Sequence, residues 1–312
     1  MKRLVFDYIR IFIIVALVMC LMEVLSVWEP TRWPIAYLTD SVDYISGNVG
    51  AGEIVPYIER AEYPNGATKL IIGDSVCHQM FSDLQELNDD YLIIGSNGAI
   101  TMAGQYILFT EFIENHPDAT DVYLFVLPGS LERSFDTNYG YQYAVMPFVE
   151  TDTLKDLDYD TIDIMRKTYG SLFMRYKVVS VIDRSALDRK LYLNKLKAET
   201  EGYEQEYPYE LADRYIGRIN DICNENGIAF HMYPVPVCES SRGSVQELES
   251  LYDSSMLSSF ASDFFDMIYY FDEEQAADGV HFSGEYADQK HYNELIRQMY
   301  SDTGLLETLR LE

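Results

Sequence analysis

Short runs of consecutive apolar residues, many of them β-branched, alternate along this chain with segments of helical periodicity. Strands that are apolar throughout are typical of a sheet covered on both faces by helices. The predicted strands are 69–72, 91–94, 122–127, 228–233 and 267–271. The predicted helices are 76–87, 102–115, 209–226, 245–264 and 283–300, the last with Ser283 as its N-cap. This order predicts an α/β fold of three α/β/α layers around a doubly wound, mainly parallel five-stranded sheet.

The charge of the chain restricts what it can bind. Its 312 residues include 51 acidic and 23 basic ones, for a formal net charge of −28. A phosphate backbone requires a surface rich in lysine and arginine, so we predict no nucleic-acid partner. Four cysteines are too few for a disulfide scaffold. Cys223 and Cys238 either form one bridge or stay as two buried thiols, and the sequence leaves both open.

The N-terminal segment, residues 1–28, is predicted to be a signal anchor. Three basic residues precede an apolar run, 11–27, that only Glu23 interrupts. The run has nearly the ~20 residues of a membrane-spanning helix, and the basic residues before it orient the N-terminus toward the cytoplasm. The only tryptophans, Trp28 and Trp33, follow where an interfacial aromatic belt is expected. The alternatives are a cleaved signal peptide, for which no small-x-small site is present, and a buried core helix.

The rest of the chain divides into a connector and a globular domain. Residues 29–63 are predicted to lead from the membrane to an extracytoplasmic domain, 64–312. Within that domain, residues 129–208 interrupt the strand–helix alternation with many tyrosines and a more basic helical part, 165–197. An insertion of this length at a functional edge is either a lid or substrate platform, or a packing subdomain.

A serine follows the first predicted strand, and a histidine with an aspartate follows the last. Because ligands of parallel sheets bind beyond the carboxyl ends of the strands, these residues belong to one edge. Ser75 lies at a strand-to-helix turn, which exposes its hydroxyl and offers backbone amides to an oxyanion. A serine nucleophile needs a base. His281 is the predicted base, and Asp278, three positions earlier, is predicted to orient its imidazole.

Together, the sequence Gly-Asp-Ser at 73–75 and the Asp-x-x-His pattern at 278–281 resemble the SGNH (GDSL-type) hydrolase family. The resemblance covers 69–127 and 229–300. It implies a flavodoxin-like sheet, with Ser75 as nucleophile and the late block as acid and base. The insertion lies outside it.

The middle of the chain departs from this family. The family has a glycine after the second strand and an asparagine after the third, both as oxyanion donors. Here the sequence Gly-Ser-Asn-Gly-Ala stands at 95–99, and 127–132 contains no asparagine. We therefore predict Asn97 and Gly98 as oxyanion donors, in a placement similar to that of membrane-anchored members that modify surface polymers. Ser130 or the Gly129 amide is the alternative donor in place of the asparagine that is missing after the third strand.

The remaining candidates lie near the same edge. Asp74 is predicted to anchor the turn that carries the serine. His78 either lines the pocket or competes as the base, and His231 is a core or rim residue. The five histidines lack metal-ligand spacing, and no phosphate-binding glycine loop is present. We therefore predict neither a metal nor a cofactor.

Two functions of different classes remain. The first is a membrane-anchored extracytoplasmic serine esterase or O-acyltransferase that acts on a cell-surface polysaccharide or teichoic-acid-like polymer. The resemblance implies a membrane-bound O-acyltransferase as a partner. The second is a catalytically weak scaffold that binds a glycan or such an acyltransferase. A secreted lipase without an anchor is a third, weaker alternative.

Overall fold

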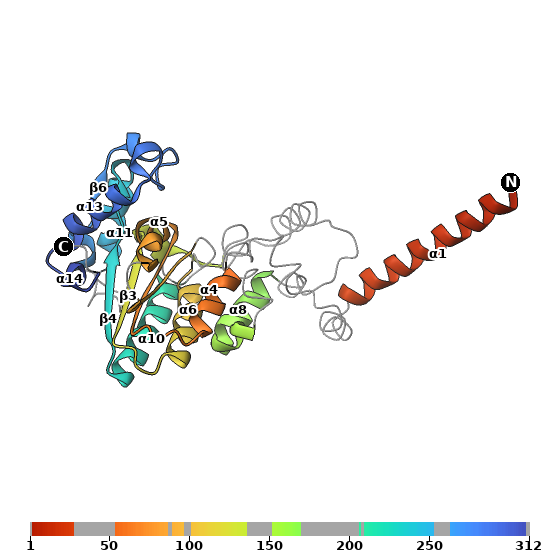
Figure 1. The fold of residues 1–312 in the computed structure, drawn as a ribbon, viewed down its shortest axis with the longest axis horizontal. Coiled ribbons are helices and arrows are strands. Elements are labelled where there is room, and N and C mark those ends of the chain that lie inside the picture. Colours follow the sequence, from red (N-terminus) through yellow and green to blue (C-terminus); the bar gives the residue numbers. More distant parts are fainter. Residues whose placement is uncertain are drawn as a thin grey trace.

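The computed structural model describes residues 2–27, 54–86, 89–96, 101–135, 152–169, 206, 209–252 and 263–309. Its centre is a parallel four-stranded sheet in the order β2-β1-β3-β4 (Figure 1). The strands are β1 (Lys69–Gly73), β2 (Tyr91–Gly95), β3 (Asp121–Val126) and β4 (Ala229–Pro234). Gly73 of β1 is in register with Gly95 of β2 and Phe125 of β3, so the three carboxyl ends form one edge. The α/β class and the parallel sheet agree with the prediction from sequence.

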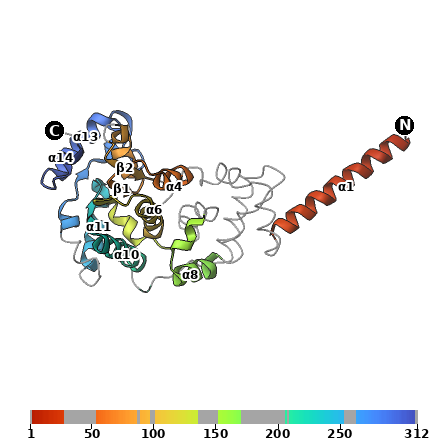
Figure 2. The ribbon, with the colours of Figure 1, turned by 60° about the horizontal axis from the view of Figure 1, so that its bottom comes forward.

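Helices cover both faces of the sheet (Figure 2). Alternate residues of each strand point to opposite faces, so Leu70 and Ile72 join one buried cluster and Ile71 joins the other. The first cluster includes residues of α4 (Ile54–Glu62), α6 (Met102–Asn115), α10 (Glu210–Asn226) and α11 (Arg242–Tyr252). The second includes residues of α5 (Ser75–Phe81), η2 (Ser82–Glu86), α13 (Gln289–Tyr300) and α14 (Leu305–Leu309).

The prediction of a fifth strand in the same sheet was wrong. Of 267–271, only Tyr270–Phe271 is a strand, β6, and it pairs in parallel with β5 (Val237–Cys238) in a separate sheet. The amides of Met267 and Ile268 bond to carbonyls of Asp263 and Phe265, which closes a helical turn where the strand was expected. Pro236 lies between β4 and β5, and a proline has no amide to continue the ladder with β3.

The predicted helix bounds hold in part. The helix at 102–115 is confirmed at both ends. The helix expected from Ser283 begins instead at Gln289, because the Asp288 carboxylate accepts the amide of His291 and caps it. The Ser283 hydroxyl accepts the amide of Ala277, which closes the preceding loop, where η8 (Glu273–Gln275) and η9 (Gly284–Tyr286) lie.

The N-terminal segment forms helix α1 (Lys2–Val27), which projects away from the other described residues (Figure 1). Across the part of the chain that the structure describes, no helix has both the length and the apolar character to span a membrane, so the predicted transmembrane helix is unsupported. Trp28 and Trp33 lie outside the described residues. Part of the predicted connector forms α4, whose Ile54 and Ile58 are buried in the core.

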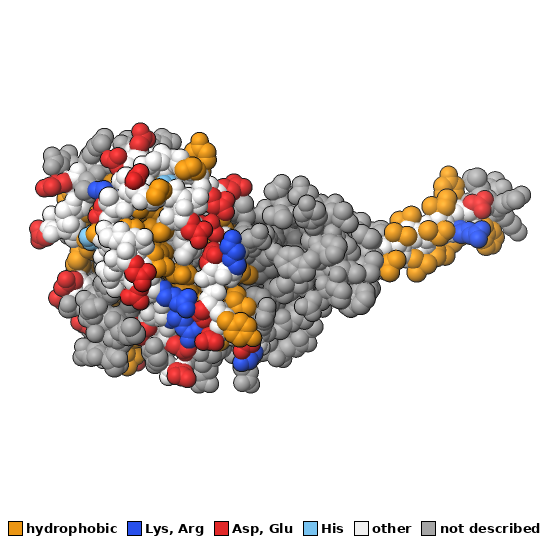
Figure 3. Space-filling model, turned by 90° about the horizontal axis from the view of Figure 1, so that it is seen from below, with side chains coloured by type: hydrophobic (Ala, Val, Ile, Leu, Met, Phe, Trp, Pro, Cys, Tyr) orange, Lys and Arg blue, Asp and Glu red, His pale blue; other side chains and the backbone are white. Residues whose placement is uncertain are grey.

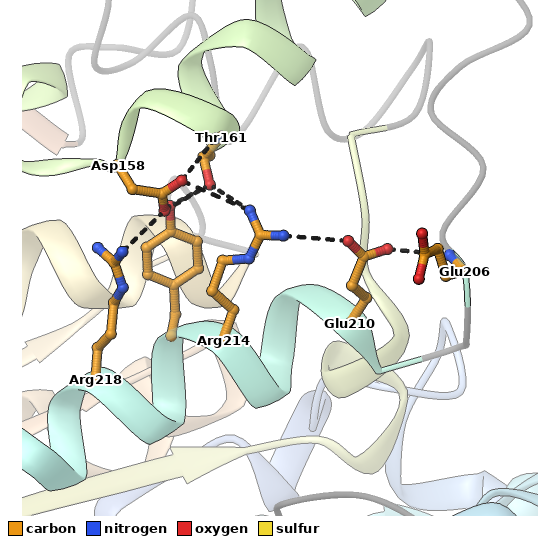
Figure 4. A network of polar contacts seen from close by, with 7 residues as sticks. Asp158, Thr161, Glu206, Glu210, Arg214 and Arg218 are labelled. Carbon is orange, nitrogen blue, oxygen red and sulfur yellow. Dashed lines mark hydrogen bonds and ion pairs between the residues drawn. The ribbon is translucent and has the colours of Figure 1, made fainter.

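The described part of the insertion comprises η3 (Pro128–Glu132), η5 (Asp152–Asp156) and α8 (Tyr159–Tyr169). Polar contacts join α8 to α10 through Asp158 (Figure 4). Its carboxylate accepts the Tyr215 hydroxyl at 2.9 Å and pairs with Arg218 at 3.5 Å. Burial acts to raise the pKa of Asp158, but hydrogen bonds from Thr161 and Tyr215 outweigh it and lower that pKa. This part of the insertion therefore packs on the domain.

Cys223 and Cys238 are both buried and free. Cys223 belongs to the cluster on one face of the sheet and Cys238 to the cluster on the other. The sheet between them accounts for two thiols instead of a bridge.

Candidate active site

Ser75 lies at the carboxyl edge of the sheet. Strand β1 ends at Gly73 and α5 begins at Ser75, with Asp74 as the N-cap between them. The Asp74 carboxylate accepts the amides of Val76 at 3.1 Å and Cys77 at 3.4 Å, as an N-cap aspartate does. The strand-to-helix turn predicted from sequence thus places the Ser75 side chain at the edge, where it is partly exposed.

His281 and Asp278 meet Ser75 at this edge. The His281 Nε2 atom lies 2.7 Å from the Ser75 Oγ atom, although the two residues are 206 positions apart. The His281 Nδ1 atom lies 2.7 Å from the Asp278 Oδ2 atom. A hydroxyl, an imidazole and a carboxylate therefore form one hydrogen-bonded chain, in the arrangement of a serine hydrolase triad.

The loop that carries Asp278 is fixed by its own hydrogen bonds. The second carboxylate oxygen accepts the amides of Val280 at 2.9 Å and His281 at 2.7 Å. The side-chain hydrogen bond from His281, followed by these amides, lowers the pKa of Asp278 to about 2. The group is therefore a carboxylate at neutral pH and accepts a hydrogen bond from the Nδ1–H group of His281, which leaves Nε2 facing Ser75 as the acceptor.

Asp74 and Ser130 join the turn after β1 to the turn after β3. The Asp74 carboxylate accepts the Leu127 amide at 2.6 Å and the Ser130 hydroxyl at 3.0 Å. Burial raises the pKa of Asp74, and these hydrogen bonds oppose the rise. Asp74 is 4% exposed and Ser130 8%. Both therefore lie in the interior instead of lining an open pocket, and Asp74 anchors the turn, as the sequence indicates.

His78 and His231 have partners other than Ser75. His78 Nδ1 lies 3.3 Å from the Tyr57 hydroxyl of α4, which holds the ring at the α4–α5 contact. The Ser75 hydroxyl is engaged by His281, so the structure does not support His78 as a competing base. His231 stacks on Tyr123 at the sheet rim. Asn97 and Gly98, the predicted oxyanion donors, lie outside the described residues.

Two glycines let α5 approach the sheet edge. A Cβ atom added to Gly73 would lie 2.6 Å from the Cys77 Cβ atom of α5 and 2.1 Å from the Phe125 carbonyl oxygen of β3, and one added to Gly95 would lie 2.4 Å from the His78 amide nitrogen of α5. Real Cβ atoms do not approach backbone that closely, so only glycine fits there. Reasoning from sequence missed this role of Gly95, although its place at the end of a strand was the available signal.

The sequence also gave no indication of Gln79. Its side-chain amide meets the backbone of Phe282, the residue after His281. A glutamine on a short helix carries no motif, so only the fold reveals the contact.

A second set of titratable groups lies on the opposite face of the sheet. Glu111 of α6 is 6% exposed, and burial together with the nearby Asp156 raises its pKa to about 7. A cavity of about 350 Å³ beside it is lined by Tyr106, Phe109 and Asp156, among others. The residues described by the structure contain no group of three or more side chains that would hold a metal ion.

Comparisons of the chain with protein-family models, with curated proteins and with solved structures find no match. The motifs of the sequence and the geometry at the sheet edge are therefore what indicate a function.

Proposed function

We propose that this protein is a serine esterase or O-acyltransferase of the SGNH type, with Ser75 as its nucleophile. The observation that carries the proposal is the hydrogen-bonded chain from Ser75 through His281 to Asp278, with both side-chain contacts at 2.7 Å. Each residue comes from a motif that resembles the matching block of that family. A serine hydroxyl hydrogen-bonded to an imidazole that a carboxylate orients is suited to nucleophilic attack on an acyl carbonyl.

The proposed reaction has two halves. In the first, the Ser75 oxygen attacks an ester or thioester carbonyl while its proton passes to His281 Nε2. The Asp278 carboxylate stabilises the imidazolium, which then protonates the leaving group as the acyl-serine forms. In the second half, His281 deprotonates the acceptor, whose oxygen attacks the acyl-serine carbonyl. The bond between the acyl group and the Ser75 oxygen then breaks, and the His281 imidazolium returns the proton to that oxygen. Water as acceptor makes the protein an esterase, and a polymer hydroxyl makes it a transferase. Asn97 and Gly98 are proposed, with the Ser75 amide, to bind the oxyanion.

The openness of the site supports a large acceptor. The side chains of His281 and Asp278 are 38% and 57% exposed. A polymer chain can approach a triad at an open edge, whereas small-molecule sites usually enclose their ligand. We therefore propose a cell-surface polymer as the acceptor and retain a membrane-bound O-acyltransferase as the proposed source of acyl groups. The net charge of −28 favours a polysaccharide over a phosphate-rich, teichoic-acid-like polymer.

The proposed location follows from the N-terminal sequence alone. We propose that residues 1–28 anchor the chain in the cell membrane with the N-terminus in the cytoplasm and the domain outside. The basic residues before the apolar run support this orientation. Cell fractionation tests the anchor: the full chain should stay with membranes after a high-salt wash, and a chain found in the soluble fraction would overturn the proposal.

The alternative is a scaffold that binds a glycan or an acyltransferase without turnover. The absence of an asparagine at 127–132, where the SGNH family supplies an oxyanion donor, favours this alternative. A weak oxyanion site would lower the rate of acyl transfer by two to three orders of magnitude, roughly, without affecting binding.

Covalent labelling separates the two functions. A fluorophosphonate probe should label the wild-type protein, and Ser75→Ala should remove the label. Ser250→Ala is the matched control, because Ser250 lies exposed on α11 and bonds only to its own helix. It should label like the wild type. A folded wild-type protein that never labels would support the scaffold.

A further inference from the structure

We propose that Gln79 is a positioning residue that holds the base, His281, against the nucleophile, Ser75. This inference rests on the proposed function of the triad. The hydrogen bonds of the Gln79 side chain go to the main chain of Phe282, the residue that follows His281, and not to the Ser75 hydroxyl or the imidazole.

The contact uses both ends of the glutamine amide. The Gln79 Oε1 atom accepts the Phe282 amide at 3.2 Å, and the Gln79 Nε2 atom donates to the Phe282 carbonyl at 3.3 Å. Gln79 lies four residues after Ser75 on α5, so the two side chains project from the same face of the helix. The element that presents the nucleophile thus also binds the main chain next to the base.

Phe282 is a rigid point in the loop. The residue is 2% exposed. The centroid of its ring lies 4.5 Å from the ring centroid of Phe271 and 6.0 Å from that of Tyr292. The packed ring anchors Phe282 in the core, and the two hydrogen bonds with Gln79 hold its main chain in place relative to α5. His281 is one residue away, so its distance from Ser75 follows from this attachment.

The two contacts of the triad depend on Gln79 to different degrees. Asp278 and His281 belong to one short loop, which the bonds from the Asp278 carboxylate to the Val280 and His281 amides close locally. That pair survives without Gln79. The contact between Ser75 and His281 joins two separate elements, and Gln79 bonds the same two elements beside it. Losing Gln79 therefore loosens the serine–histidine contact and spares the histidine–aspartate contact.

A double-mutant cycle tests this division. Gln79→Met keeps the length of the side chain and removes both hydrogen bonds. We expect it to lower the rate constant of fluorophosphonate labelling about 10- to 100-fold, the effect of misplacing a catalytic group by about 1 Å. In a His281→Ala background, the same substitution should change the rate constant less than about twofold, because the group that Gln79 positions is gone.

Gln85 supplies the matched control. Its side chain also bonds a backbone amide and a backbone carbonyl, those of Ile93 and Tyr91 on β2, both at 2.7 Å. Gln85→Met should lower the melting temperature at least as much as Gln79→Met, yet leave the labelling rate of the folded protein unchanged. If Gln79→Met does not fold, Gln79→Glu replaces it: that variant keeps the acceptor for the Phe282 amide, loses the donor, and should label at an intermediate rate.

The outcomes separate this inference from the proposed function. A wild-type protein that does not label overturns both. A wild-type protein that labels, together with Gln79 variants that label equally fast, overturns the inference alone. Equal losses from Gln79→Met in the wild-type and His281→Ala backgrounds also overturn it, since they would reveal a general structural effect.

Discussion

The two aspartates nearest the triad lie in opposite environments. Asp278 is exposed and holds the His281 ring, and that hydrogen bond lowers its pKa to about 2. Asp74, adjacent to Ser75, is buried, and burial raises its pKa. The same residue type therefore serves two purposes: a reliable negative charge beside the base, and a hub of hydrogen bonds that shapes the turn.

The hub at Asp74 gives a prediction at the scale of one residue. Asp74→Asn replaces one carboxylate oxygen with the NH2 group of a side-chain amide. In one orientation this NH2 group faces the Leu127 amide, and in the other it faces the amides of Val76 and Cys77, all of which are donors. At least one buried amide loses its acceptor, so the free energy of unfolding should fall by about 1–3 kcal/mol. Urea unfolding followed by circular dichroism measures the change.

Ser130→Ala is the matched control for Asp74→Asn. It removes one donor to the same carboxylate and leaves every amide satisfied. Its cost should be smaller, about 0.5–1.5 kcal/mol. Equal stability of Asp74→Asn and the wild type would contradict the role of Asp74 as a hub.

Sequence reasoning located the triad at this scale because each member stands in a recognisable local pattern. Ser75 follows a strand, and His281 follows Asp278 by three positions; a parallel sheet brings both patterns to one edge. It did not find the partner of His78, whose ring contacts Tyr57 of α4, in a segment expected to be a connector. No local pattern reveals a partner that a distant helix supplies.

At the scale of elements, continuous apolar runs predicted the central strands well. Strands β1, β2 and β3 are covered on both faces, so apart from Lys69 and Asp121 at the starts of β1 and β3 they are continuous runs of buried residues, and such runs can be recognised in the sequence. The run at 267–271 has the same composition, yet its first residues close a helical turn and its last two pair with β5. The sheet that this segment joins is determined by the end of β4 and the position of β5. These are tertiary features, and the sequence of 267–271 does not predict them.

The close contact between α5 and β2 at Gly95 leads to a testable prediction. Gly95→Ala places a Cβ atom 2.4 Å from the His78 amide nitrogen, so α5 must move away from the sheet edge. Because α5 begins with Ser75, we expect both a lower melting temperature and at least about a tenfold slower fluorophosphonate labelling per folded molecule.

Gly217→Ala is the control for this steric effect. A Cβ atom at Gly217, on α10, meets no atom within 4 Å. Its labelling rate should match that of the wild type. If Gly95→Ala labels as fast as Gly217→Ala, the close approach of α5 does not position Ser75.

The electrostatic field of the whole molecule acts on a substrate before any individual contact forms. The segment 272–288, which carries the base, contains six acidic residues and no lysine or arginine. The acidic residues are Asp272, Glu273, Glu274, Asp278, Glu285 and Asp288. This segment lies at the triad on a chain of net charge −28, so the local and the overall fields have the same sign. An anionic substrate is repelled as it approaches, and a cationic one is attracted.

This field predicts a charge preference for the proposed esterase activity. Among aryl acetates of matched size, one with a quaternary ammonium group should have a kcat/KM about tenfold above one with a carboxylate at low ionic strength. Salt screens charges over about 10 Å at 0.1 M, so the ratio should approach one as salt is added. Glu273→Lys combined with Glu274→Lys should reduce the ratio, because both charges lie in the segment that carries His281. A ratio near one at low salt, or one that salt does not change, would contradict electrostatic selection and would readmit polyanionic polymers as acceptors.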